Sequence, residues 1–236
     1  MPQDIQAPVA ILGCGLIGIS WAALFLHHGI NVRAWDPSSA ARNALSERIK
    51  APMAQLADMG PSAVTLGNLS VFTEISVALN GVLFAQENAP EDIDLKHDIY
   101  HNFELFAGPE TLIASSASGL SWSSLSAKMS SPERLLNAHP FNPAHLVPLV
   151  EMYSPLGAVL DRAERLYCQI GRVPVRMKRE ATGHIANRLA SALWREAVNI
   201  VRGYCGCRVC RSGVGEWTSP ALGSRWRAYD LPFGWG

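Results

Sequence analysis

The sequence has no excess of charge of either sign, because 20 Lys and Arg residues balance 20 Asp and Glu residues. It therefore lacks the basic field that collects nucleic acid or an anionic membrane. It also lacks an apolar run of the roughly 18 residues that suggest a membrane span. Its start, MPQDIQAP, has no basic-then-apolar signal pattern. We expect a soluble cytoplasmic protein without nucleic-acid or membrane partners.

Cysteine is scarce and unevenly placed. Three of the five cysteines, Cys205, Cys207 and Cys210, crowd together, so they do not form a spaced disulfide framework. The odd count favours a reducing compartment. Three close thiols could instead form a zinc or redox cluster, but a fourth ligand at structural spacing is missing. We expect no metal site.

Short apolar runs alternate with helical patterns along the chain, whose 236 residues suggest one large or two unequal domains. This alternation predicts an α/β fold with a parallel, doubly wound sheet and a site at the carboxyl ends of its strands. Pro52 is expected to kink or divide the second helix. The expected strands are 9–12, 30–35, 69–72, 81–86, 111–115, 135–138, 147–153 and 173–177; the expected helices are 16–28, 38–56, 91–103, 161–170 and 182–201.

The stretch GCGLIG stands between the first apolar strand and the helix that follows it. Gly13 allows a tight turn, Gly15 lets a pyrophosphate approach the backbone, and Gly18 lets the helix pack closely on the strand. Leu16 and Ile17 begin the helix, whose N-terminus would face the phosphates. The pattern predicts a dinucleotide site formed by these five residues.

An acidic residue, Asp36, ends the next strand about 20 residues after the glycines, as in dinucleotide-binding folds. Its carboxylate can accept hydrogen bonds from an adenosine ribose and repel a 2′-phosphate, so NAD is favoured over NADP. Arg33 is the nearby group that would argue for NADP. It precedes the acid by three residues and is expected to lie along the strand.

Several ordered motifs resemble the L-3-hydroxyacyl-CoA dehydrogenase family. They are GCGLIG, ENAPEDIDLK, SSASGL, HPFNPAHLVPLVE and KREATGHIANRLASALWREA, which together cover residues 9 to about 202. The resemblance implies a Rossmann-type doubly wound domain that binds NAD, followed by a truncated α-helical domain. We place these domains at residues 1–179 and 180–236, with 203–219 atypical for the family.

The resemblance implies four catalytic positions. His139 aligns with the catalytic histidine and Glu151 with the glutamate that pairs with it, while Ser118 and Asn187 align with residues that bind the substrate oxygen. Oxidation of a secondary alcohol needs a base for the hydroxyl proton, and an unperturbed imidazole, with a pKa of about 6.5, suits that task. A carboxylate on the other ring nitrogen would fix the tautomer and stabilise the imidazolium. Ser118 and Asn187 are read as neutral donors to the alcohol or carbonyl oxygen.

Glu87 and Lys96 match family positions on the cofactor side. We expect them to touch the nicotinamide half of NAD or the substrate edge, and the competing interpretation is an ordinary solvated helix start. Asn142 is expected to hold the turn in HPFNP. The remaining histidines are expected to be structural: His27, His28, His97, His101, His145 and His184.

The segment 203–219 departs from the family pattern, in which a Gly-Ile/Val-Ala stretch and an aspartate precede a GxGxRW run. GSRW resumes that pattern here. One codon choice for GYCGCR, shifted by one base, encodes Gly-Ile-Ala-Asp-Val-Glu, so we suspect two compensating reading-frame changes. The chain then stops before most of the later helices, which in the family close the site and form the homodimer. Dimerisation and activity are therefore open questions.

The substrate is expected to be a small hydroxy acid or an acyl-CoA. The family acts mainly on 3-hydroxyacyl-CoA, but it has free-acid branches: L-carnitine dehydrogenase, and L-gulonate 3-dehydrogenase with its relative lambda-crystallin. Residues 51–95 contain no Lys or Arg to hold a CoA phosphate, and GCGLIG and ENAPED look more like the free-acid branches. We expect NAD-linked oxidation of a 3-hydroxyl, with free acids ahead of the thioester. The alternative is a catalytically idle NAD-binding or structural relative, or an inactive fragment.

Overall fold

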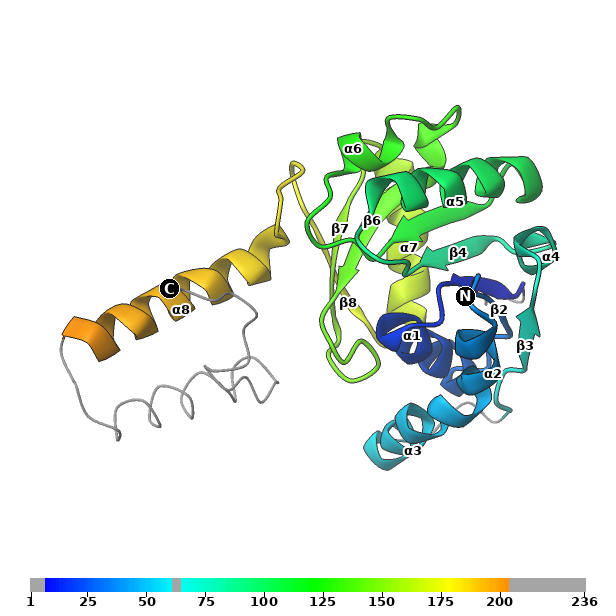
Figure 1. Ribbon diagram of the computed structural model, residues 1–236, viewed down its shortest axis with the longest axis horizontal. Helices are drawn as coiled ribbons and strands as arrows, with labels where there is room; N and C mark the ends of the chain where they lie inside the picture. The colour runs from blue at the N-terminus through cyan, green and yellow to red at the C-terminus, as the bar shows by residue number, and fades with distance from the viewer. Residues whose placement is uncertain (1–6, 61–64, 204–236) are drawn as a thin grey trace. The chain divides into compact units, whose positions relative to one another are not determined.

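The computed structural model describes residues 7–60 and 65–203 (Figure 1). The chain divides between Thr182 and Gly183 into two compact units, which are described separately. In the described part of the first unit, eight strands form one sheet in the order β3-β2-β1-β4-β5-β6-β7-β8. The predicted Rossmann-type α/β fold is confirmed. The strands are β1 Val9–Leu12, β2 Val32–Trp35, β3 Leu69–Phe72, β4 Phe84–Glu87, β5 Leu112–Ser115, β6 Leu135–Pro140, β7 Leu149–Tyr153 and β8 Val173–Arg176.

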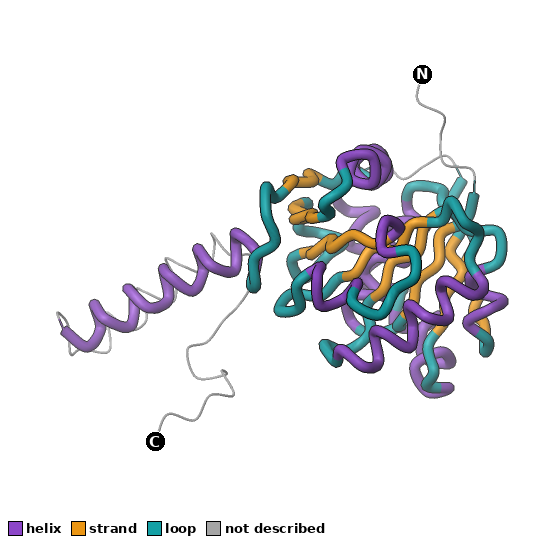
Figure 2. Tube along the Cα trace, turned by 90° about the horizontal axis from the view of Figure 1, so that it is seen from above, coloured by secondary structure: helices purple, strands orange, loops and turns teal. Residues whose placement is uncertain are grey.

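Helices cover both faces of this sheet, as Figure 2 shows. Successive side chains of a strand point to opposite faces of the sheet. The residues of β1 therefore alternate between two hydrophobic cores, one on each face. The helices of the first unit are α1 Leu16–His27, α2 Ser39–Arg48, α3 Lys50–Met59, α4 Ile75–Leu79, α5 Ile93–Phe106, α6 Trp122–Ser126 and α7 Gly157–Gln169, with a 3₁₀ turn at Pro132–Arg134.

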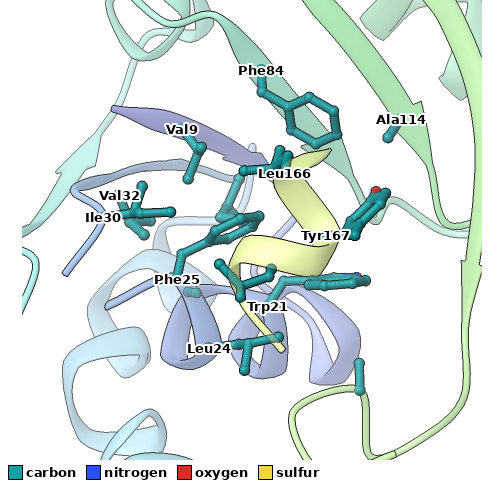
Figure 3. Packing of buried hydrophobic residues seen from close by; sticks show 14 of the residues in the cluster. Val9, Trp21, Leu24, Phe25, Ile30, Val32, Phe84, Ala114, Leu166 and Tyr167 are labelled. Carbon is teal, nitrogen blue, oxygen red and sulfur yellow. The ribbon is translucent and has the colours of Figure 1, made fainter. Parts of the chain in front are cut away.

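The first core lies on the side of Val9 and packs aromatic side chains from α1 and α7 (Figure 3). Trp21 stacks on Phe25, with 5.9 Å between ring centroids, and lies 5.4 Å from Tyr167. The second core lies on the side of Ala10 and Leu12 and packs against α5, from which Ile99, Tyr100 and Phe103 enter it. Full burial of each large side chain contributes about 1.5–3 kcal/mol, so both helical layers are held firmly to the sheet.

The sheet is not wholly parallel, which corrects the sequence-based expectation. The first six strands in the sheet order, β3-β2-β1-β4-β5-β6, pair in parallel. Strand β7 runs antiparallel to β6, and β8 is parallel to β7. A parallel connection needs a crossover of about a dozen residues or more, usually including a helix. Residues 141–148 are too few for one, so the chain turns back directly. This turn places His139 opposite Glu151.

The helical segment after Asp36 is divided, as expected from Pro52, and the break lies at Ile49. Helices α2 and α3 meet at Ile49, and Pro52 lies in the first turn of α3. In that turn a residue needs no intrahelical partner for its N–H, so proline is tolerated there without a kink. The short helices α4 and α6 had no counterpart among the sequence-based expectations.

The described part of the second unit is one helix, α8, which spans His184–Gly203. It occupies most of the predicted 182–201 segment. The atypical segment 203–219 lies almost wholly outside the described residues, as do its crowded cysteines. Among the described helices, none is both long enough and apolar enough to cross a membrane.

Candidate active site

The glycine turn between β1 and α1 has the geometry of a phosphate cradle. Gly13 has a φ of +95°, and a Cβ atom there would lie 2.9 Å from the Asn88 carbonyl carbon. A Cβ on Gly18 would lie 1.9 Å from the Gly13 oxygen, so neither position accepts a side chain. A Cβ on Gly15 would instead meet nothing within 4 Å. The backbone is therefore open at the one glycine where a pyrophosphate must approach.

The start of α1 favours an anion at this opening. Gly15 is the N-cap residue, no side chain caps the helix, and its first turn contains no acidic residue. Unpartnered N–H groups and the helix dipole attract negative charge at such an end. Leu16 and Ile17 form this first turn, with the Leu16 side chain exposed and Ile17 half-buried. These features fit the dinucleotide predicted from the sequence.

Asp36 lies beside the same turn. Its carboxylate accepts hydrogen bonds from the backbone N–H of Cys14 at 2.7 Å and of Ser38 at 2.8 Å. Arg33 points elsewhere, as expected, because its guanidinium donates to two carbonyl oxygens of α4 at 2.6 and 3.2 Å. Sequence reasoning missed Arg42, whose Nη1 donates to the Asp36 carbonyl oxygen at 2.5 Å.

Cys14, inside the glycine turn, is a buried small residue. Burial, reinforced by the nearby Asp36 charge, raises the pKa of its thiol to about 12. A thiol that stays protonated is a poor nucleophile, so the structural interpretation of this cysteine stands.

His139 and Glu151 form a buried pair on β6 and β7. The His139 Nδ1 atom lies 3.3 Å from a carboxylate oxygen of Glu151, and the two residues are 6% and 1% exposed. Phe141 packs edge-on against the imidazole, with 5.1 Å between ring centroids. Since Nδ1 faces the carboxylate, Nε2 is the nitrogen that could act on a substrate. The structure brings these two predicted residues together, while their catalytic role stays a prediction.

Ser118 lies in the loop that follows β5, the strand next to β6. Its hydroxyl donates a hydrogen bond of 2.8 Å to Oε2 of Glu91, in the loop that follows β4. The other oxygen of Glu91 accepts from the backbone N–H of Gly119 and from that of Leu120, the latter at 3.1 Å. A carboxylate can only accept hydrogen bonds, so Ser118 directs its proton to Glu91. Its predicted role as a donor to substrate is not the state seen here.

Glu91 was missed as a site residue because an acid after Pro90 reads as an ordinary first-turn partner of the helix dipole. Partial burial would raise the pKa of its carboxyl group. The hydrogen bonds from Gly119, Ser118 and Leu120 outweigh that effect and hold the pKa below its usual value. Glu91 is therefore ionised at neutral pH.

Glu87 and Lys96 are buried and bind each other, which corrects the interpretation as a solvated helix start, while their contact with the cofactor or the substrate stays a prediction. The Lys96 ammonium lies 2.5 Å from Oε1 of Glu87, and the residues are 1% and 0% exposed. Oε2 of Glu87 accepts hydrogen bonds from the hydroxyls of Tyr100 and Ser115, both at 2.8 Å. Neither side chain is solvated. The pair ties β4, α5 and β5 together.

Two further residues singled out from the sequence are described separately. Asn187 lies on α8 in the second unit, so its predicted meeting with Ser118 and His139 stays a prediction. His145 is a satisfied core histidine, as expected, because its ring nitrogens lie 3.0 Å from the Ser20 hydroxyl and 2.7 Å from Oε1 of Gln55.

Comparisons with known proteins agree with this geometry. Residues 8–181 match the family described as 3-hydroxyacyl-CoA dehydrogenase, NAD binding domain. An L-carnitine dehydrogenase of Streptomyces griseus is 39% identical over 85% of this chain and 61% of its own length. One of Pseudomonas aeruginosa is 41% identical over 81% of this chain and 61% of its own length. The chain thus spans about three fifths of these relatives.

Solved structures give the same result. The crystal structure of 5-formyl-3-hydroxy-2-methylpyridine 4-carboxylic acid 5-dehydrogenase, an NAD⁺-dependent dismutase, is 28% identical with a TM-score of 0.82, covering 93% of this chain and 72% of that one. A 3-hydroxybutyryl-CoA dehydrogenase of Escherichia coli is 27% identical with a TM-score of 0.76, covering 84% of this chain and 43% of that one. The chain therefore belongs to the 3-hydroxyacyl-CoA dehydrogenase family, whose NAD-binding domain it carries.

Proposed function

We propose that the protein oxidises the 3-hydroxyl group of a free hydroxy acid, L-carnitine or a close analogue, with His139 as the base. The observation that carries the proposal is the buried contact between His139 and Glu151. Strand β6 places this pair in the same sheet as the glycine turn, on the carboxyl side where open α/β sheets bind ligands.

Each residue of the site has a chemical task. His139 would take the hydroxyl proton through Nε2, and Glu151 would hold the ring by its Nδ1 and stabilise the charge that develops. The glycine turn and Asp36 would hold NAD, which supplies the hydride acceptor when bound. Asn187 would help to orient the substrate oxygen. The second oxygen-binding position is Ser118.

A free acid is favoured over a CoA thioester for two reasons. Relatives that match 81–85% of this chain are named L-carnitine dehydrogenases. Residues 51–95, which include α3 after its first residue, Lys50, and all of β3, α4 and β4, offer no Lys or Arg to a CoA phosphate. Gulonate-like acids remain a second choice within the same reaction class. A cytoplasmic location and a homodimer are further proposals from the family resemblance.

The test is NADH formation at alkaline pH with L-carnitine, L-gulonate and L-3-hydroxybutyryl-CoA in parallel. We expect turnover of L-carnitine, and we expect His139→Ala to reduce it at least 100-fold, since positioned general bases contribute about 10²–10⁴-fold. His101→Ala, which changes an exposed histidine of α5, is the matched control. Binding of NAD should survive both substitutions.

Other outcomes would change the assignment. Preferential turnover of the thioester would move the chain to the acyl-CoA branch. Equal turnover by wild type and His139→Ala would remove His139 as the base. Measurable NAD binding without turnover of any of the three substrates would favour the alternative of a catalytically idle NAD-binding relative.

A further inference from the structure

The connector, which we define as residues 178–183, joins β8 to α8. Just before it, the N–H of Met177 donates to the Met152 carbonyl oxygen at 2.8 Å, which continues the ladder between β8 and β7. The next two residues, Lys178 and Arg179, are exposed. The chain therefore leaves the sheet at this point.

Glu180 attaches the connector to the sheet unit a second time. Its carboxylate accepts hydrogen bonds from the N–H of Ser123 at 2.9 Å and from the Ser123 hydroxyl at 2.8 Å. Ser123 lies in the first turn of α6, where N–H groups have no intrahelical partner, and the N-cap residue Ser121 accepts from Ser124 instead. Glu180 thus supplies an acceptor that α6 needs. Both partners belong to the first unit, so the contact is internal to that unit.

The chain beyond Glu180 has a different character. Three residues, 181–183, precede α8, which begins at His184. Gly183 has a φ of +76° and His184 a φ of +47°. The left-handed region is open to glycine but uncommon for other residues, so the backbone turns sharply where the second unit begins. A Cβ atom on Gly183 would lie 3.9 Å from Cγ of Arg188, an ordinary contact, so the φ and not crowding favours glycine here.

We propose that Glu180 is a latch: it fixes the connector to the sheet unit up to residue 180 and confines bending between the two units to residues 181–183. The segment 178–180 is held at both ends, by the sheet at Met177 and by α6 at Ser123. Hinges are a few residues at the ends of elements that absorb changes in φ and ψ, and residues 181–183 fit that description. The latch goes beyond the proposed function and depends on neither substrate nor NAD.

The first experiment is ¹⁵N relaxation of the whole chain without ligand, since order parameters are about 0.85 for a rigid backbone and below about 0.6 for a flexible one. In the wild type they should stay near the first value through residue 180 and fall at 181–183. In Glu180→Ala they should also fall at 178–180, because the connector loses one of its two attachments. Glu133→Ala, which changes an exposed acid of the 3₁₀ turn, is the control and should match the wild type. Unchanged order at 178–180 in Glu180→Ala would overturn the proposal, as would low order there in the wild type.

The second experiment is limited proteolysis with trypsin, which cleaves after lysine and arginine and can therefore act at Lys178 and Arg179. Cleavage of a transiently opened segment follows the population of the open form when reclosing is fast. Ser123→Ala removes one hydrogen bond of the latch and leaves the cleavage sequence intact. It should speed cleavage at 178–179 roughly 2- to 10-fold, the effect of one lost hydrogen bond.

Ser70→Ala is the matched control for proteolysis, because it changes an exposed serine of β3, at the opposite edge of the sheet from β8. Thermal melts of both serine variants should match the wild type, so that faster cleavage reports local opening. Equal cleavage rates in Ser123→Ala and Ser70→Ala would contradict the latch.

The two experiments also separate the latch from the proposed function. Absence of turnover on all three substrates would refute the proposed function and leave the relaxation and cleavage results unaffected. A wild-type protein that oxidises L-carnitine but is flexible at 178–180 would refute the latch alone.

Discussion

The buried pair of Glu87 and Lys96 predicts an unusual pattern of stability loss. Removing one partner of a buried ion pair leaves an uncompensated charge and costs about 3–5 kcal/mol. In Lys96→Met, the Glu87 carboxylate keeps hydrogen bonds from Tyr100, Ser115 and the Ala89 N–H, so the loss should lie at the lower end.

Glu87→Gln should cost more than Lys96→Met. The Lys96 ammonium would keep only the amide oxygen and the Ala89 carbonyl oxygen, which lies 3.1 Å away. The new amide nitrogen would also face the hydroxyls of Tyr100 and Ser115, which donate to the carboxylate. Burial, and then the Glu87 charge, raise the pKa of Tyr100 well above its usual value, so that hydroxyl stays a donor.

Urea unfolding followed by circular dichroism measures both losses. Each kilocalorie lowers the midpoint temperature by roughly 2–4 °C in a protein of this size, so thermal shifts of about 6–20 °C should accompany them. The control is Lys128→Met, which removes an exposed pair with Asp94 at 3.2 Å and should change stability by about 1 kcal/mol or less. The argument fails if Lys96→Met costs no more than this control, or costs more than Glu87→Gln.

Three further predictions concern the cofactor end and a core histidine. Gly15→Ala should fold normally but lose NAD affinity in binding assays, whereas Gly18→Ala should lose stability in thermal melts. Equal stability of the two variants would contradict the inference that a Cβ atom fits at Gly15 and clashes at Gly18. Asp36→Ser should gain NADPH affinity roughly tenfold in titrations, because it removes charge repulsion of the 2′-phosphate. Adding Arg42→Ala should abolish this gain, and a gain that persists without the arginine would exclude Arg42 as the group that holds the 2′-phosphate. Burial, and then the Arg172 charge, lower the pKa of His145, so stability should be intact above about pH 6.5 and fall as the pH drops below it. His145→Gln should flatten that fall in urea melts at pH 5 to 8, and an unchanged slope would exclude this histidine as its source.

The glycine turn shows what the sequence could predict well. A positive φ at Gly13 and a close approach at Gly18 are demands that only glycine meets, so residue identity alone reports the local geometry. The pairing of His139 with Glu151 was predicted from motif resemblance. Its cause became visible only in the antiparallel register of β6 and β7, which depends on a short connection between distant parts of the chain.

Burial was the quantity that the sequence could not provide. Lysine side chains are usually solvated. Only the fold shows that the Glu87 carboxylate neutralises Lys96 in the core. The same difficulty applies to Glu91, whose place beside Pro90 suggested a helix start. The donors that bind it come from residues 118–120, far along the chain, so no local pattern could reveal them.

Two acids of the segment ENAPE support one loop from two sides. The Glu87 carboxylate binds the Ser115 hydroxyl in the core, at the point where β5 ends. The backbone carbonyl oxygen of Glu87 accepts a hydrogen bond of 2.9 Å from the N–H of Ser116. Glu91 binds the same loop near the surface, from Ser118 to Leu120. The buried Glu87 contact should therefore determine whether the loop forms, and the exposed Glu91 contact should determine where the Ser118 hydroxyl lies. Changes at Glu87 should therefore lower stability, whereas changes at Glu91 should leave stability nearly intact, because a half-solvated carboxylate leaves no buried charge behind.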